Sequence, residues 1–234
     1  MISHFFPTTE EPTTNAIYPV FDACPTVIKE EVSWVLVKSS PSSAPGPDTI
    51  PYSVRKRLHK LHPDILLNLV DPLVQMGYHP AALKRAEGVV LDKPGKPSYD
   101  TPASYKVIVL LETLSKVVER LIANRLAAQA HELGLLYPNQ CASLPGVSSF
   151  HAAVFLSHEV TIAHRLKLKA SSLFLDIKGG FDNIKPGLLT GLLRERGVSP
   201  YIVSWIRSCL SRRACHLKFQ SAPEDFTWVA IGTP

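Results

Sequence analysis

Apolar residues recur at helical spacing along much of this 234-residue chain. The clearest amphipathic stretch is 63–78, whose predicted buried face carries Ile65, Leu66, Leu69, Leu73 and Met76. Residues 111–133 predict a longer helix that ends at Gly134 and buries Leu114, Val117, Val118, Leu121, Ile122 and Leu126. Further helices are expected within 147–168, from Pro186 to Arg194 with Gly197 beyond the end, and over roughly 200–210.

The N-terminal part of the chain is patterned differently. Residues 1–17 are polar and rich in Thr, Pro and Glu, which predicts a disordered tail. A helix is expected to begin near Pro25, with Thr26 as its cap and carboxylates in its first turn. Four prolines and Gly46 fall within 41–51, so we expect a loop there.

Short apolar runs predict strands. Those over 86–91 and 105–109 flank a Lys-Pro-Gly-Lys-Pro turn and are expected to form a hairpin. The run 173–177 predicts a short buried central strand, and further strands are expected over 214–219 and 226–231. The fold class is therefore α+β, with a helical and hairpin part followed by a sheet-and-helix part.

Composition narrows the functional classes only a little. The net charge is +5 and the pI is near 9.0, which suits a nucleic-acid partner and an ordinary soluble protein equally well. The four cysteines form no C-x-x-C pair or zinc spacing, which favours a reducing compartment. No signal peptide or membrane-length apolar run is evident, so we expect an intracellular protein, nuclear or cytoplasmic, that is not secreted and has no membrane partner.

The stretch 171–182 carries the clearest chemistry in the sequence. Its apolar run delivers Asp176 at the end of the predicted strand, where a carboxylate can hold a hard cation such as Mg²⁺. Gly179 and Gly180 follow, and without Cβ atoms they let the backbone approach a phosphate closely. Phosphoryl or nucleotidyl transfer is the first hypothesis. The simpler alternatives are that Asp176 caps a turn and that Asp182 caps the following one.

This stretch resembles the first catalytic motif of reverse transcriptases, especially those of non-LTR (LINE-like) retrotransposons. Similar family blocks stand before it in the family's order, at 43–48, 91–99, 103–111 and 116–120. The resemblance extends over roughly residues 18–234.

The resemblance implies roles for particular residues. Asp176 would be a catalytic metal ligand, joined by the backbone carbonyl of Ile177, with Mg²⁺ as the cofactor. Phe181 would pack under the sugar of the incoming dNTP, although a core phenylalanine is an alternative. The triphosphate would be bound by Lys178, Gly179 and Gly180.

Lysines of the predicted hairpin would add positive charge against the triphosphate. They are Lys93, Lys96 and Lys106, each of which could also be an ordinary solvated lysine. Lys106 stands where the family usually has arginine, and this loses the planar fork that suits phosphate. Leu144 and Val147 stand where two family arginines are usual, which would weaken backbone contacts to template or primer.

The resemblance implies a reverse-transcriptase-like right-hand polymerase fold, made of fingers and a partial palm and truncated before the second palm carboxylate motif and the thumb. The expected divisions are a tail at 1–17, a fingers-like region at 18–168 and a partial palm at 169–234. The parent enzyme would add dNMP to a DNA primer 3′-OH on an RNA template. We expect this chain alone to be inactive, since one carboxylate cannot hold two Mg²⁺ ions.

Two other hypotheses stay open on the sequence. The chain could be a non-catalytic nucleic-acid-binding remnant, or a decayed product without function. The oligomeric state is open.

Overall fold

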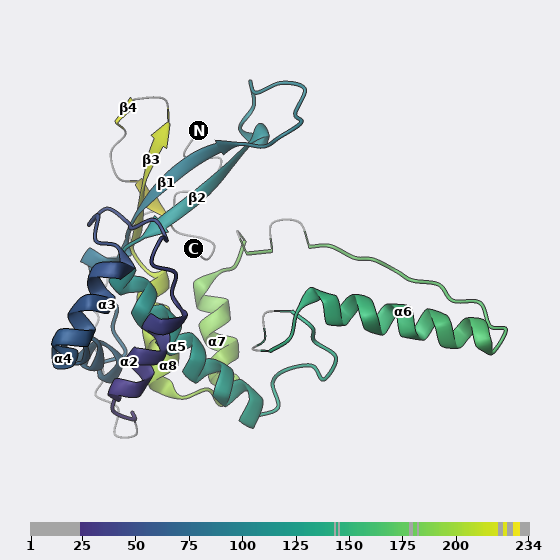
Figure 1. The fold of residues 1–234 in the computed structure, drawn as a ribbon, viewed down its shortest axis with the longest axis horizontal. Coiled ribbons are helices and arrows are strands. Elements are labelled where there is room, and N and C mark those ends of the chain that lie inside the picture. Colours follow the sequence, from purple (N-terminus) through teal and green to yellow (C-terminus); the bar gives the residue numbers. More distant parts are fainter. Residues whose placement is uncertain are drawn as a thin grey trace.

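The computed structural model of this chain describes residues 24–142, 144, 146–177, 180–181, 183–219, 222–223 and 227–229. It contains a body of packed helices with a small sheet beside it, and one helix that projects away from both (Figure 1). The tail predicted over 1–17 lies outside the described residues, as do Lys178, Gly179 and Asp182.

Most of the predicted helices and strands are present in the structure, with ends shifted by a few residues. The α-helices are α2 (Lys29–Lys38), α3 (Tyr52–Leu61), α4 (Pro63–Gln75), α5 (Thr113–Glu132), α6 (Ser149–Arg165), α7 (Pro186–Glu195) and α8 (Pro200–Leu210). The strands are β1 (Arg85–Asp92), β2 (Tyr105–Leu111), β3 (Arg213–Phe219), β4 (Ala222–Pro223) and β5 (Thr227–Val229). Two 3₁₀ turns, η1 (Ala81–Lys84) and η2 (Pro102–Ser104), precede β1 and β2. The α+β class is confirmed, and α3 is an element that the hydrophobic pattern did not predict.

The main core lies among α2, α4, α5 and α8. Its fully buried side chains include Val32, Leu66, Val70, Leu121 and Ile202. The predicted buried face of α5 is confirmed, with four of the six residues buried and the other two packed against the core.

The predicted face of α4 was partly wrong. Leu66, Val70 and Val74 are buried, whereas Ile65 and Leu69 are exposed. Spacing alone did not decide between two overlapping apolar stripes, and contact with α3, α5 and α8 selected one of them.

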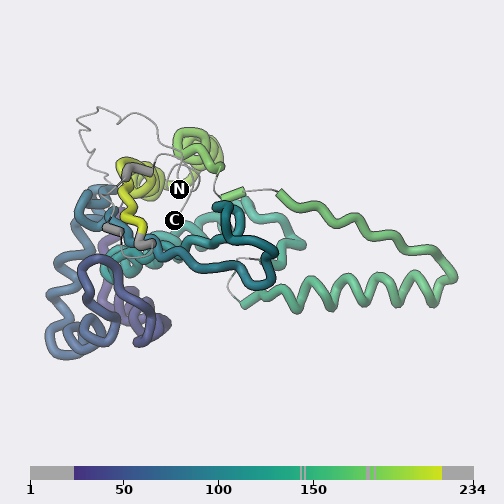
Figure 2. The backbone as a smooth tube through the Cα atoms, turned by 90° about the horizontal axis from the view of Figure 1, so that it is seen from above, coloured from purple at the N-terminus to yellow at the C-terminus, as the bar shows by residue number. Residues whose placement is uncertain are grey.

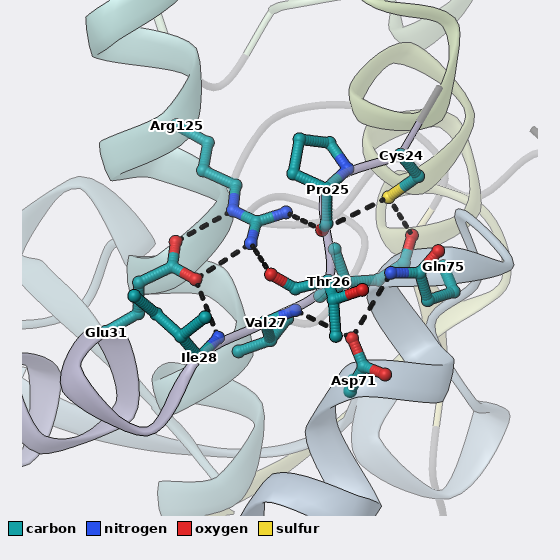
Figure 3. Close-up of polar contacts among 10 residues, drawn as sticks. Cys24, Pro25, Thr26, Val27, Ile28, Glu31, Asp71, Gln75 and Arg125 are labelled. Atoms are coloured by element: carbon teal, nitrogen blue, oxygen red, sulfur yellow. Dashed lines mark hydrogen bonds and ion pairs between the residues drawn. The ribbon is translucent and has the colours of Figure 1, made fainter. Parts of the chain in front are cut away.

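The segment before α2 is held by side chains rather than by a threonine cap (Figure 3). Glu31 Oε2 accepts a hydrogen bond from the Ile28 N–H at 3.1 Å, which satisfies the start of the helix. The prediction that Thr26 caps this helix was wrong, because the helix begins three residues later. The Thr26 carbonyl instead accepts a hydrogen bond from Arg125 at 3.2 Å.

The sheet has the order β2-β1-β3-β4, and β5 pairs with β3 as β4 does. Strands β1 and β2 form the predicted antiparallel hairpin, with Leu91 opposite Lys106. Strand β3 runs parallel to β1, and Gly88 lies opposite Leu217. A Cβ on Gly88 would meet the Leu217 side chain at 2.5 Å, so glycine permits this close packing.

The predicted central strand at 173–177 was wrong. These residues are extended but unpaired, and Leu173, Phe174 and Leu175 are each at least 80% exposed. A strand becomes buried only by pairing its backbone and covering its side chains, and none of the described strands pairs with this run.

Helix α6 and the extended run that follows it project together away from the helical body in both views (Figures 1 and 2). The helix has no buried residue, and Phe150 and Phe155 are exposed on it.

Elements before and after residue 168 pack against one another in the same sheet and the same core. Strand β3 pairs with β1, and α8 contacts α4 and contributes Ile202 and Trp205 to the main core. The division at 168 stays a prediction. No helix in the described part of the chain is both long enough and apolar enough to cross a membrane.

Candidate nucleotide and metal site

The turn between β1 and β2 is organised by its own hydrogen bonds. The Lys93 N–H donates to the Ser104 carbonyl at 2.9 Å, and the Tyr99 hydroxyl donates to the Lys93 carbonyl at 2.9 Å. The Tyr105 hydroxyl donates to the Tyr99 carbonyl at 2.8 Å, and the two tyrosine rings meet edge to face. Gly95 has φ +76°, the left-handed conformation that favours glycine. These hydrogen bonds give the turn, which carries Lys93 and Lys96, an ordered conformation.

The three hairpin lysines all face solvent. Lys93 Nζ donates to the Ala103 carbonyl at 3.0 Å, so its charge is held close to the turn. Neighbouring residues of a strand point to opposite faces of the sheet. Val107 on β2 packs against the small core, so Lys106 lies on the opposite, solvent-facing side. Lys96 is exposed within the turn. The three lysines lie on the hairpin and its turn, and their role at a triphosphate stays a prediction.

The proline-rich loop is fastened to the base of this hairpin. Asp48 Oδ2 accepts a hydrogen bond from Arg55 Nη2 at 2.9 Å, and Arg55 Nε donates to Thr113 Oγ1 at 2.6 Å. Gly46 packs so closely on the backbone of Leu111 and Glu112 that a Cβ would collide with it. The loop therefore supports the junction between β2 and α5 and is more than a linker.

The described residues of the first catalytic motif are not assembled into a site. Asp176 is exposed, and so are Ile177 and Phe181, whose exposed fractions are 82% and 73%. Gly180 N–H donates to the Ile177 carbonyl at 3.3 Å, which forms a local turn. No hydrogen bond or ion pair within the described ranges links Asp176 to the hairpin lysines. The alternative of a core role for Phe181 is also unsupported here.

The oxygen donors of this segment are of the right class for Mg²⁺, but their arrangement is incomplete. A carboxylate and a backbone carbonyl are hard ligands. Among the residues that the structure describes, the one group of three or more His, Cys, Asp or Glu side chains close enough to share an ion does not include Asp176. The described residues therefore do not form a magnesium centre.

Sequence reasoning missed a buried polar cluster between α5, α8 and the loop after α4. It contains His79, Ser115, Glu119 and Cys209. Burial, together with the nearby Lys84 charge, lowers the pKa of His79 to about 4. These residues lie far apart in the sequence, between His79 and Cys209, so no local motif could have revealed the cluster.

In a comparison with known proteins, a single family model matches both the hairpin turn and the Asp176 segment. The family model described as "Reverse transcriptase (RNA-dependent DNA polymerase)" matches residues 91–231. That span begins in β1 and includes the hairpin turn, α5 and Asp176. The chain belongs to the reverse transcriptase family, which confirms the resemblance read from the sequence.

Curated relatives agree with this assignment. The chain is 32% identical over 207 residues to a probable RNA-directed DNA polymerase from transposon X-element of Drosophila melanogaster, covering 87% of this chain and 22% of that protein. It is 29% identical over 217 residues to the RNA-directed DNA polymerase from mobile element jockey of the same species, covering 89% and 22%. A Pol polyprotein from the type-1 retrotransposable element R1 of Bradysia coprophila is 28% identical, with 73% and 16% covered. The chain thus spans about a fifth of the length of these relatives.

Proposed function

We propose that this chain supplies the fingers (18–168) and the first part of the palm (169–234) of a retrotransposon RNA-directed DNA polymerase. The observation that carries the proposal is the family match over 91–231, because this one span contains both the three hairpin lysines and Asp176. The whole polymerase adds dNMP to a primer 3′-OH on an RNA template. Bound Mg²⁺ would supply electrostatic stabilisation to this transfer reaction.

Within that enzyme, the residues of this chain have separate tasks. Asp176 and the Ile177 carbonyl offer oxygen ligands to the metal. Lys93, Lys106 and Lys178 offer positive charge to the triphosphate, with Gly179 and Gly180 leaving room for its approach. Phe181 lies under the nucleotide sugar and excludes a 2′-hydroxyl.

A second candidate is nucleic-acid binding without catalysis. It is favoured by the contrast between the well-formed, exposed lysine hairpin and the exposed Asp176, which belongs to no ligand group within the described part of the chain. Under this candidate the chain binds template and primer through phosphate contacts alone.

Binding and primer extension by the purified chain separate these functions. We expect an RNA–DNA hybrid to bind and to weaken steeply between about 50 and 200 mM salt, because phosphate contacts release counterions. The double variant Lys93→Gln/Lys106→Gln should bind more weakly and with a shallower salt slope. Lys60→Gln, an exposed lysine on α3, is the matched control and should change little. Absence of binding, or an equal loss in the control, would overturn the hairpin's role.

Extension on poly(rA) with an oligo(dT) primer, dTTP and Mg²⁺ tests catalysis directly. We expect none from the chain alone, because the described residues assemble no magnesium centre around Asp176. Extension that Asp176→Asn abolishes would show that the site assembles in solution and would favour the polymerase over the non-catalytic candidate.

A further inference from the structure

The buried cluster between α5 and α8 contains three potential metal ligands. One side-chain donor atom from each of His79, Glu119 and Cys209 lies within 4.8 Å of the other two. His79 is 1% exposed and Cys209 is buried, while the Glu119 residue as a whole is partly exposed. The three residues come from separate segments, so the helical core itself brings them together.

One ring nitrogen of His79 forms a hydrogen bond within the cluster. Ser115 Oγ donates to Glu119 Oε1 at 2.7 Å, and the same Oγ lies 3.0 Å from His79 Nε2. When Glu119 is ionised, the serine proton is directed to the carboxylate, and Nε2 then donates to the serine oxygen. His79 Nδ1 is buried and has no hydrogen bond of ordinary geometry among the described residues, while the Leu83 backbone lies near enough to raise the pKa of the ring. A metal-ligating histidine typically has its second nitrogen oriented by a hydrogen bond of this kind.

We propose that one ring nitrogen of His79, a Glu119 carboxylate oxygen and Cys209 Sγ bind one Zn²⁺ ion. An imidazole, a carboxylate and a thiolate are all ligands that zinc accepts, and three protein ligands leave a fourth tetrahedral position for water. A soft thiolate disfavours Mg²⁺, so this site is chemically distinct from the one expected around Asp176. The ion ties α5, α8 and the loop after α4 to one another.

Nearby positive charges are compatible with such an ion. Lys84 and Arg213 act electrostatically on Cys209, and Lys84 also faces His79. Burial raises the pKa of Cys209 to about 12 and also raises that of Glu119, so burial disfavours the charged form of each group. Zinc displaces the thiol proton and any carboxyl proton to solvent. The two anionic ligands then offset the two charges of the ion, so Lys84 and Arg213 meet little added positive charge.

Cobalt substitution tests the site in the purified, chelator-stripped full chain. One equivalent of Co²⁺ should give sulfur-to-cobalt charge-transfer absorption, and Zn²⁺ should abolish it by competition. Cys209→Ser should eliminate this band, and Glu119→Gln and His79→Asn should each weaken binding at least tenfold. Cys215→Ser is the matched control, because that buried thiol lies on β3 outside the cluster, and it should keep the band. A band that survives Cys209→Ser would overturn the proposal.

X-ray absorption on the unsubstituted zinc-loaded chain is independent of how the variants fold. We expect one sulfur at about 2.3 Å and nitrogen or oxygen ligands at about 2.0–2.2 Å. A first shell without sulfur, or failure to retain one equivalent of zinc after gel filtration, would overturn the site. These readouts require no polymerase activity, so they are separate from the proposed function.

Discussion

Arg125 on α5 forms a bidentate ion pair with Glu31 on α2 through two hydrogen bonds. Its Nε and Nη2 donate to the two carboxylate oxygens at 2.8 Å each (Figure 3). The same guanidinium donates through Nη1 to the Pro25 carbonyl at 2.8 Å. One planar side chain thus fixes the chain entry to α2 and the α2–α5 packing at once, and lysine has no equivalent fork.

Replacing Arg125 is therefore expected to destabilise the helical body. Arg125→Lys should lower the free energy of unfolding by about 2 kcal/mol, because a partly buried carboxylate and two carbonyls lose partners. Urea denaturation followed by circular dichroism measures this change. Arg120→Lys, at an exposed position of the same helix, is the control and should stay within about 0.5 kcal/mol. Equal effects at the two positions would contradict the clamp.

The Arg125–Glu31 pair also predicts a pH dependence. Burial pushes the pKa of Glu31 upward, but hydrogen bonds from Arg125 and the Ile28 N–H outweigh this and hold it below its ordinary value. The folded state therefore binds the proton less readily than the unfolded state, and the contribution is present above the ordinary glutamate pKa and is lost as pH falls through the folded pKa. Glu31→Gln should be less stable than the parent chain near pH 7, with the difference shrinking toward pH 3. A pH-independent difference would sink this prediction, and Glu30→Gln, exposed one residue away, is the control.

Gly46 is predicted to be intolerant of a side chain for steric reasons. Gly46→Ala should cost about 1–3 kcal/mol, because the added Cβ meets the rigid backbone where β2 passes into α5. Gly191→Ala in the middle of α7 is the opposite case, with nothing within 4 Å of its added Cβ. That control should be neutral or stabilising by up to about 1 kcal/mol. Thermal unfolding of both variants measures the contrast, and a neutral Gly46→Ala would refute the close packing.

The exposed run before Asp176 is expected to contribute little to stability. Leu175 is 85% exposed, so Leu175→Ser should change the free energy of unfolding by less than about 0.5 kcal/mol. Leu121→Ala, at a fully buried position on α5, should cost about 2–5 kcal/mol. A Leu175→Ser variant that approached the cost of Leu121→Ala would mean that the run forms a buried strand in solution.

The lysine hairpin was predicted correctly from the sequence, whereas the strand before Asp176 was not. The hairpin was predictable because its strands are neighbours along the chain and the turn residues between them, Gly95 above all, carry local conformational signals. The strand predicted at 173–177 had the right composition, yet a strand also needs a partner that no local pattern supplies. Among the described strands none pairs with it.

Local sequence by itself determined the helices α4 to α8, the hairpin, the basic charge and the family, because each depends on short-range periodicity or on residues in order. Tertiary structure alone decided which stripe of α4 is buried, the parallel pairing of β3 with β1, and the exposed position of Asp176. It also brought His79, Glu119 and Cys209 together. The physical reason is that burial and proximity arise from contacts between segments that are distant in the sequence. The free energy of such a contact depends on both segments, so neither segment alone predicts it.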